Sequence, residues 1–176
     1  MPIVYNSVGA GLYDGKVKLS DGNEFDIYAI ISLIGDPSQD ETEIKGDDTT
    51  LATFISNIRE ELKIEANGLS FDTIQAITGN SATSSATGIE IPLGTDSQKN
   101  PPFIEVQGFT KAKDTGNSAV TIQKIWHKVQ IKSIKVTQEG EGEFKLEMTG
   151  VAYQTATDIE GAALATSRVS TLKVLY

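Results

Sequence analysis

The stretch Gly46–Asn80, GDDTTLATFISNIREELKIEANGLSFDTIQAITGN, carries the clearest start and stop signals in this sequence. Its second half predicts a short helix over residues 71–78. Ser70 is placed to cap the first turn, Asp72 adds negative charge at the positive end of the helix dipole, and Gly79 follows the last turn. Apolar residues recur at helical spacing at Phe71, Ile74 and Ile77. The helix can therefore lay one apolar stripe on a larger element, which we expect to be a sheet.

The first half of this stretch, residues 52–66, fits two periods. As a helix, its apolar stripe would consist of Leu51, Phe54, Ile55, Ile58 and Leu62. As a strand, one face would carry Phe54, Ile58, Leu62, Ile64 and Ala66, and the other would carry Thr53, Asn57, Arg59, Glu61, Lys63 and Glu65. Ser56 and Glu60 interrupt the apolar face, and Ile55 interrupts the polar face. Local propensity favours the helix, but we predict a strand because two abutting helices would need a clearer break before Ser70.

Composition indicates a mainly β protein, and 176 residues suit a single domain over residues 1–176. The 15 Lys and Arg against 24 Asp and Glu give a formal net charge of −9, which argues against a general binder of nucleic acid or anionic membranes. The absence of cysteine excludes disulfides and thiolate metal sites and leaves the redox compartment open. No secretion signal or membrane span is evident, so we expect a soluble protein of the cytoplasm that makes it.

Residues 1–15 are expected to form an irregular N-terminal arm. A phosphate-binding loop is the sharper alternative, but these glycines lack the strand, helix and lysine that such a loop requires. The pairs Asp14-Gly15 and Asp21-Gly22 each favour a tight hairpin turn. Residues 25–34 predict a strand that is apolar on both faces and ends at Asp36-Pro37.

Two polar stretches are expected to be loops. Residues 38–50 are acidic, with one short strand candidate at 42–45, and their carboxylates do not match the ligand spacing of a calcium-binding loop. A solvated acidic loop is therefore the preferred interpretation. Residues 81–102 are rich in Ser, Ala, Thr and Pro and predict a long exposed loop of the kind that is functional or is ordered by a partner.

The C-terminal part predicts further strands. Residues 103–110 have a strand pattern, and the apolar phase of residues 120–137 slips along its length, which suggests bulges or a short break. Residues 143–153 return as a hairpin with Phe144, Leu146 and Met148 on one face. A small polar segment over residues 155–165 leads to a final strand at 168–175.

No catalytic constellation is evident, so neither enzyme activity nor a cofactor nor a metal is expected. The single histidine, His127, is predicted to be a surface or interface residue of a strand. No GxSxG motif and no second histidine accompany it. Glu60 and Glu61 are adjacent, so on a strand they would point to opposite faces and could not cooperate as acid and base.

The charge distribution is more informative than any motif. Residues 119–138 contain no acidic residue and four lysines: Lys124, Lys128, Lys132 and Lys135. A nucleic-acid site here would need several stacking aromatics, and the run contains only Trp126. The alternative is self-complementarity, in which a basic sheet edge of one copy meets an acidic strand of the next and builds a head-to-tail ring.

The sequence resembles the tail tube proteins of tailed bacteriophages, the major tail proteins that stack as hexameric rings. The resemblance is carried by the stretch Gly46–Asn80, by FIEVQGFTKAK at 103–113, and by TIQKIWHKVQIKSIKVTQ at 121–138 followed by FKLEMTGVAYQT at 144–155. It extends from Glu41 to about Gly161 and depends on the order of the elements more than on any single motif.

The resemblance implies a β-sandwich or half-barrel with one flanking helix and long loops, in which rings enclose a lumen for the tape measure protein and viral DNA. It also implies partners at the tail tip or baseplate and a terminator protein, with assembly in the host cytoplasm and a place in the virion tail. Lumen-facing candidates are Glu61, Glu65, Glu143 and Glu147, because an acidic wall would not retain phosphates. Subunit-interface candidates are Lys124, Lys128, Lys132, Lys135, Asp47 and Asp48, together with loops 38–50 and 81–102.

Two alternatives remain open. The tube protein of a bacterial contractile injection or secretion apparatus shares the ring architecture. A β-sandwich carbohydrate-binding module belongs to a different class and should display an exposed row of aromatic side chains, whereas this chain has one Trp, five Tyr and six Phe with no cluster in a loop.

Overall fold

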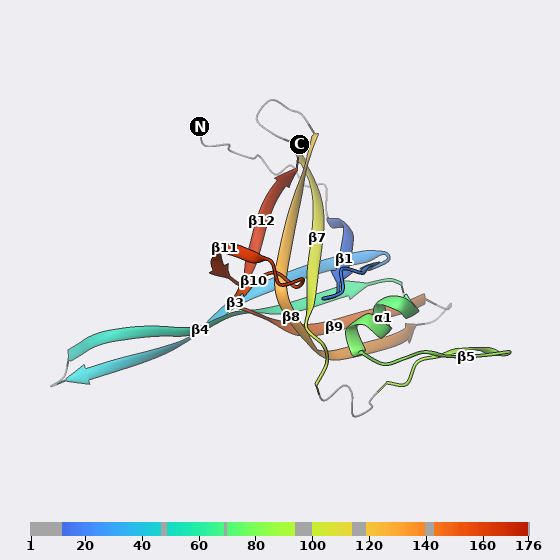
Figure 1. Cartoon of the computed structure of the whole chain (residues 1–176), viewed down its shortest axis with the longest axis horizontal. Helices are drawn as coiled ribbons and strands as arrows, with labels where there is room; N and C mark the ends of the chain where they lie inside the picture. The colour runs from blue at the N-terminus through green and yellow to red at the C-terminus, as the bar shows by residue number, and fades with distance from the viewer. Residues whose placement is uncertain are drawn as a thin grey trace.

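The computed structural model describes residues 12–46, 49–68, 70–93, 100–113, 119–139 and 143–175. It is an open, mainly antiparallel β structure with one short helix, which confirms the predicted fold class (Figure 1). The main sheet contains β1 (Leu12–Lys18), β2 (Glu24–Asp26), β3 (Ile30–Gly46), β4 (Thr49–Ala66), β7 (Ile104–Lys113), β8 (Ala119–Glu139), β9 (Glu143–Tyr153) and β12 (Ser170–Leu175). The remaining elements are α1 (Phe71–Thr78), β5 (Thr83–Ser85), β6 (Gly88–Glu90), β10 (Thr155–Thr157) and β11 (Ala163–Arg168). No helix among these is long and apolar enough to cross a membrane.

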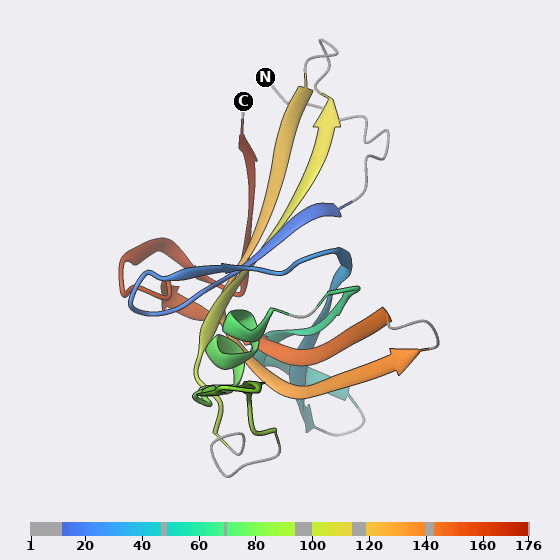
Figure 2. The same ribbon diagram turned by 90° about the vertical axis from the view of Figure 1, so that its right-hand side faces the viewer.

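The long strand β8 connects two halves of the sheet, whose strand order is β2-β1-β7-β8-β9-β4-β3. The first half of β8 lies between β7 and β12, and these three strands rise together from the body (Figures 1 and 2). Its second half pairs with β9. The change occurs at Val129, which pairs with Ile104 on one side and with Ala152 on the other. The buried core, which includes Trp126, lies where the two halves meet.

The predicted phase slips of β8 are real irregularities of its pairing. The register shifts near Val129, where β7 advances from Ile104 to Val106 while β8 moves from Val129 back to Trp126. It shifts again between Ile131 and Ser133 against β9. An extra residue at each place bends the strand, which is how one strand can serve two differently directed halves.

The ambiguous segment is a strand, β4, as predicted. It pairs with β3 on one side and β9 on the other, so both neighbours supply the main-chain hydrogen bonds that a helix would have formed internally. Leu62 and Ile64 are buried, whereas Glu61 and Lys63 are exposed on the opposite face. The alternation is interrupted by Asn57, whose positive φ of 52° accompanies a register shift against β3.

Helix α1 has the predicted caps. The Ser70 side chain accepts a hydrogen bond from the backbone N–H of Thr73 at 3.3 Å, and Gly79 has a left-handed φ of 69°. Ile74 and Ile77 are buried against the sheet. Phe71 was expected to share their stripe but is 44% exposed, because it is the first residue of the helix and lies beyond the area of contact.

The prediction of an acidic loop over residues 38–50 is wrong. The described residues of this stretch are strand residues that continue β3 and begin β4. The two strands extend as a long hairpin away from the body (Figure 1). Pro37 was expected to end the strand, but β3 is an edge strand, where the missing N–H of a proline breaks no ladder bond.

Three further expectations need correction. The turn at Asp21-Gly22 is confirmed, with Gly22 at φ 84°, whereas Asp14-Gly15 lies inside β1, in the stretch expected to be an irregular arm. The predicted strand 25–34 is two strands separated by a turn in which Ala29 has a φ of 49°. Part of the predicted loop 81–102 is a small exposed hairpin, β5–β6, because its Ser and Thr residues pair across a two-residue turn.

Candidate functional site

The second half of β8 forms a four-stranded meander with β9, β4 and β3, and its two outer edges pair with no other strand that the structure describes. Along β3 the outer side is open, and residues 131–139 of β8 pair with β9 alone. Successive strands are antiparallel, so the β3 edge and the β8 edge run in opposite directions. Open edges carry N–H and C=O groups that can pair with another chain.

Pro37 indicates which main-chain groups point outward. Because proline has no N–H, its pair with Glu60 is one in which β3 and β4 exchange no hydrogen bond. The main-chain groups of Glu60 therefore face β9, where Glu60 pairs with Ala152. Hydrogen-bonded and non-hydrogen-bonded pairs alternate along antiparallel strands, so the pair Ile64–Met148, four residues further along, is also hydrogen-bonded. The main-chain groups of Met148 thus face β4 and not β8. We infer that the N–H and C=O groups of Ile134 and Val136, on β8, face the open edge.

One face of this meander is polar and carries the lumen-facing candidates. Glu61 is exposed on it, and Glu65 and Glu147 are half-buried neighbours on paired strands. Lys63 Nζ lies 2.7 Å from Glu65 Oε1, and this hydrogen bond is the main cause that lowers the pKa of Glu65 and raises that of Lys63. Lys135 Nζ lies 3.7 Å from Glu147 Oε2. The face is therefore a mixed lattice of charges and is not uniformly acidic.

The fourth lumen-facing candidate, Glu143, begins β9, and its side chain lies outside the described part of the molecule. The interface candidates Asp47 and Asp48 also fall outside the described residues.

The four lysines of β8 do not form one basic edge. Lys124 lies in a part of β8 that is paired on both sides, and its Nζ is 3.1 Å from Glu60 Oε2. Lys128 Nζ lies 4.6 Å from the ring centroid of Phe103, and Lys132 Nζ lies 6.0 Å from that of Tyr153. Since β8 bends at its bulges, successive lysines meet different neighbours.

Glu60 lies at the junction, which is the point along β8 where pairing with β12 ends at Trp126 and pairing with β9 begins at Val129. Its carboxylate accepts hydrogen bonds from Trp126 Nε1 at 2.6 Å, Lys124 Nζ at 3.1 Å and Ser170 Oγ at 2.7 Å. Desolvation by burial would raise its pKa, but these three donors outweigh burial and hold the pKa below the ordinary range. The interruption of the apolar face of β4 by Glu60 was the signal in the sequence that could have identified this junction.

His127 was predicted to be a surface or interface residue, but it is buried within a polar network. Its Nδ1 lies 3.0 Å from Glu105 Oε2, and its Nε2 lies 2.7 Å from Thr171 Oγ1. Gln107 donates a hydrogen bond to the other Glu105 oxygen at 2.8 Å. The network connects β7, β8 and β12 and was not predicted, because its members are far apart in sequence.

No protein-family model matches this chain, and no curated protein matches it in sequence. Two solved structures that it resembles are a chain of the anti-feeding prophage baseplate and a type six secretion system protein. The first has a TM-score of 0.45 and 10% identity, covering 86% of this chain and 95% of that chain. The second has a TM-score of 0.38 and 10% identity, covering 90% and 93%. At these scores, the function of this chain has to be argued from its own geometry.

Proposed function

We propose that this chain is the structural subunit of a phage-type tail tube, in which hexameric rings stack around a lumen that admits a tape measure protein and DNA. The observation that carries the proposal is the four-stranded meander with two open, oppositely directed edges. The same architecture serves the tube of a contractile injection apparatus, so the proposal extends to that class.

Because the meander has an even number of strands, copies related by rotation about a ring axis can join edge to edge into one continuous antiparallel sheet. Placing the β3 edge of one copy beside the β8 edge of the next keeps every neighbouring pair antiparallel. Such a contact uses two different surfaces, so it is head-to-tail and forms a ring if the rotation closes. Closure also removes both open edges, which are otherwise sites of uncontrolled association.

The face of the meander that would line the lumen is suited to passage without retention. Lys63 and Lys135 are each paired with a glutamate on this face, so these two cations are not free to release counterions from a phosphate backbone. The net charge of −9 adds a general repulsion of DNA.

A carbohydrate-binding module is less well supported. Phe103 and Tyr153 are close on the surface, with ring centroids 6.0 Å apart, but their rings are inclined at 85°. Sugar rings stack on flat aromatic faces, and an edge-to-face pair offers no continuous platform.

The test is negative-stain electron microscopy of the concentrated protein, with Val136→Pro as the diagnostic variant and Val136→Thr as its control. The wild type and Val136→Thr should form rings and hollow tubes. Val136→Pro removes one edge N–H without removing a β8–β9 ladder bond, so it should remain folded by circular dichroism and lose the rings. A wild type that stays monomeric, or tubes formed equally by Val136→Pro, would overturn the proposal.

A further inference from the structure

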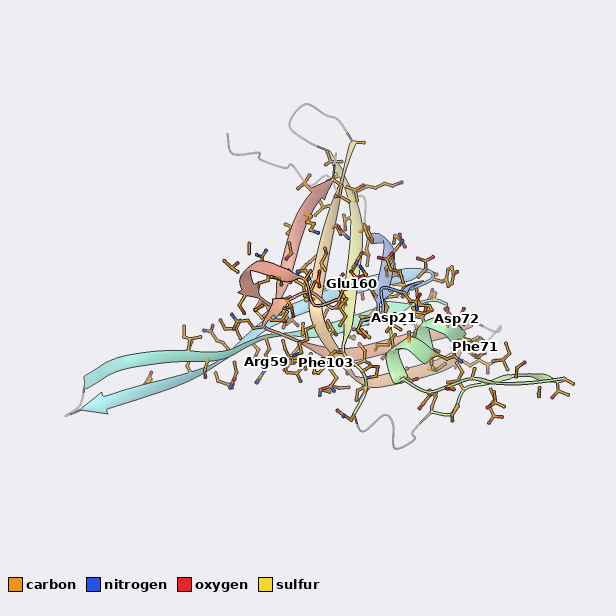
Figure 3. The ribbon with its side chains drawn as sticks, viewed as in Figure 1. Asp21, Arg59, Phe71, Asp72, Phe103 and Glu160 are labelled. Atoms are coloured by element: carbon orange, nitrogen blue, oxygen red, sulfur yellow. The ribbon has the colours of Figure 1, made fainter. Side chains whose placement is uncertain are left out.

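The surface at the start of β7, where Ile104 pairs with Val129 of β8, carries an aromatic–lysine cluster. We define this cluster as Phe103, Lys128, Lys132 and Tyr153. Phe103 and Tyr153 contact edge to face, with Lys128 over the first ring and Lys132 near the second. Phe103 is 42% exposed. Figure 3 shows Phe103 on the lower side of the body, toward the root of the β3–β4 hairpin at Arg59. The cluster is thus an accessible surface that is both cationic and apolar.

The distal part of the β3–β4 hairpin, residues 39–46 and 49–58, is the acidic arm. These residues include three acidic residues and one lysine, and Ile55 and Ile58 on the arm are 56% and 44% exposed. An isolated two-stranded ribbon is at best marginally stable in water. The arm therefore combines negative charge with exposed apolar side chains, which is the complement of the cluster.

The pairing of the strands places the cluster at the same level as the root of the arm. Across the meander, Ser38 pairs with Arg59, and Arg59 pairs with Tyr153. If the β3 edge of one copy lies beside the β8 edge of the next, the arm of the first copy continues past Ser38. It then runs along the place where Phe103 of the neighbouring copy leads into that copy's own β7.

We propose that the acidic arm of one copy docks on the aromatic–lysine cluster of the adjacent copy in the ring. This inference rests on the proposed function and names the second contact that each copy makes. Glu41, exposed on β3, pairs with Lys128 or Lys132 of the neighbour, and the isoleucines of the arm cover the Phe103 ring. Docking shields these ion pairs and supplies the packing that the arm lacks alone.

Single-stranded nucleic acid is the other ligand with suitable chemistry, because it binds lysines interleaved with aromatic rings. The root of the acidic arm lies beside the cluster in the same chain, since Arg59 pairs directly with Tyr153. The negative charge of the arm would therefore repel a nucleic acid strand. A second copy is therefore the favoured occupant.

Disulfide cross-linking can test the contact cleanly, because the chain contains no cysteine. A mixture of the single variants Glu41→Cys and Lys128→Cys, oxidised after assembly, should give a cross-linked dimer on a non-reducing gel. Glu41→Cys mixed with Lys173→Cys should give none, because Lys173 is exposed on β12, on the other side of β8. Rings seen by microscopy without the first cross-link would overturn this inference and leave the proposed function standing.

Charge reversal provides an independent measurement. The double variant Lys128→Glu with Lys132→Glu should need at least a tenfold higher protein concentration to form rings. Adding Glu41→Lys to this double variant should lower the required concentration part of the way back. A gel-shift assay with a single-stranded oligonucleotide should show no binding by the wild type. Binding that is abolished by the two lysine changes would overturn the inference in favour of nucleic acid, and absence of rings from the wild type would count against the proposed function itself.

Discussion

Glu60 Oε2 accepts a 2.6 Å hydrogen bond from the indole Nε1 of Trp126, joining β4 to β8 at the centre of the molecule. Trp126 is 1% exposed and is the largest fully buried side chain among those described. Burial of an indole N–H requires a partner, and the carboxylate also receives Ser170 from β12. One side chain thereby holds together three strands at the point where the two halves of the sheet diverge.

Glu60→Gln should lower the free energy of unfolding by about 1–3 kcal/mol, because the neutral amide accepts weaker bonds from Lys124 and from the buried indole. Urea denaturation at neutral pH measures the change. Glu61→Gln is the matched control, since its side chain is exposed on the opposite face, and it should change stability by less than about 0.5 kcal/mol. Equal effects of the two changes would contradict the assigned role of Glu60.

Stability should fall in acid because of the same group. The folded-state pKa of Glu60 is depressed, so its stabilisation is fully present above the unfolded-state pKa, about 4.3, and is lost as the pH falls through the folded value. Thermal unfolding of the wild type and Glu60→Gln between pH 7 and pH 3 should show the two midpoints converging on the acid side. A constant difference across that range would show that Glu60 does not titrate as described.

Gly35→Ala should destabilise the fold by about 1–3 kcal/mol through overpacking. A Cβ at Gly35 would lie 2.5 Å from Glu60 Oε2 and 3.0 Å from the Trp126 ring, and neither group can move without breaking the junction. Asp36→Ala, the exposed next residue, is the control and should have little effect in the same denaturation experiment. Wild-type stability in Gly35→Ala would mean that the junction tolerates an added methyl group.

His127→Phe should destabilise the fold by roughly 2–4 kcal/mol, because it leaves the buried Glu105 carboxylate with Gln107 as its remaining side-chain donor. Adding Glu105→Met removes the group that was left unpaired, so the double variant should be more stable than His127→Phe alone. A double-mutant cycle by denaturation measures the coupling. Additive losses would show that the two side chains act independently.

Replacement of residues 83–90 by a short Gly-Ser linker should leave the monomer as stable as the wild type, because every residue of the β5–β6 hairpin is exposed and the two strands pair only with each other. Asn80 must be retained, because its Nδ2 donates a 2.6 Å hydrogen bond to the carbonyl of Pro92. The variant should fail to form tubes by electron microscopy. Normal tubes would remove this hairpin from the contacts needed for stacking.

Much of the local structure was readable from the sequence. The caps of α1, the turn at Asp21-Gly22 and the alternation of buried and exposed residues in β4 each depend on neighbours a few positions apart. The continuation of β3 through Pro37 was not readable, because whether a proline ends a strand depends on the strand being at an edge, and this is a property of the whole sheet.

The candidate site divides in the same way. The sequence by itself determined that Glu61 and Lys63 lie on a polar strand face and that Glu60 interrupts the apolar one, since both follow from a period of two residues. Only the tertiary structure decided that Glu60 meets Trp126, that His127 is buried beside Glu105, and that two edges of the sheet pair with no further strand among the described residues. Each of these depends on which distant strands pair, and this pairing is selected by burial over the whole chain.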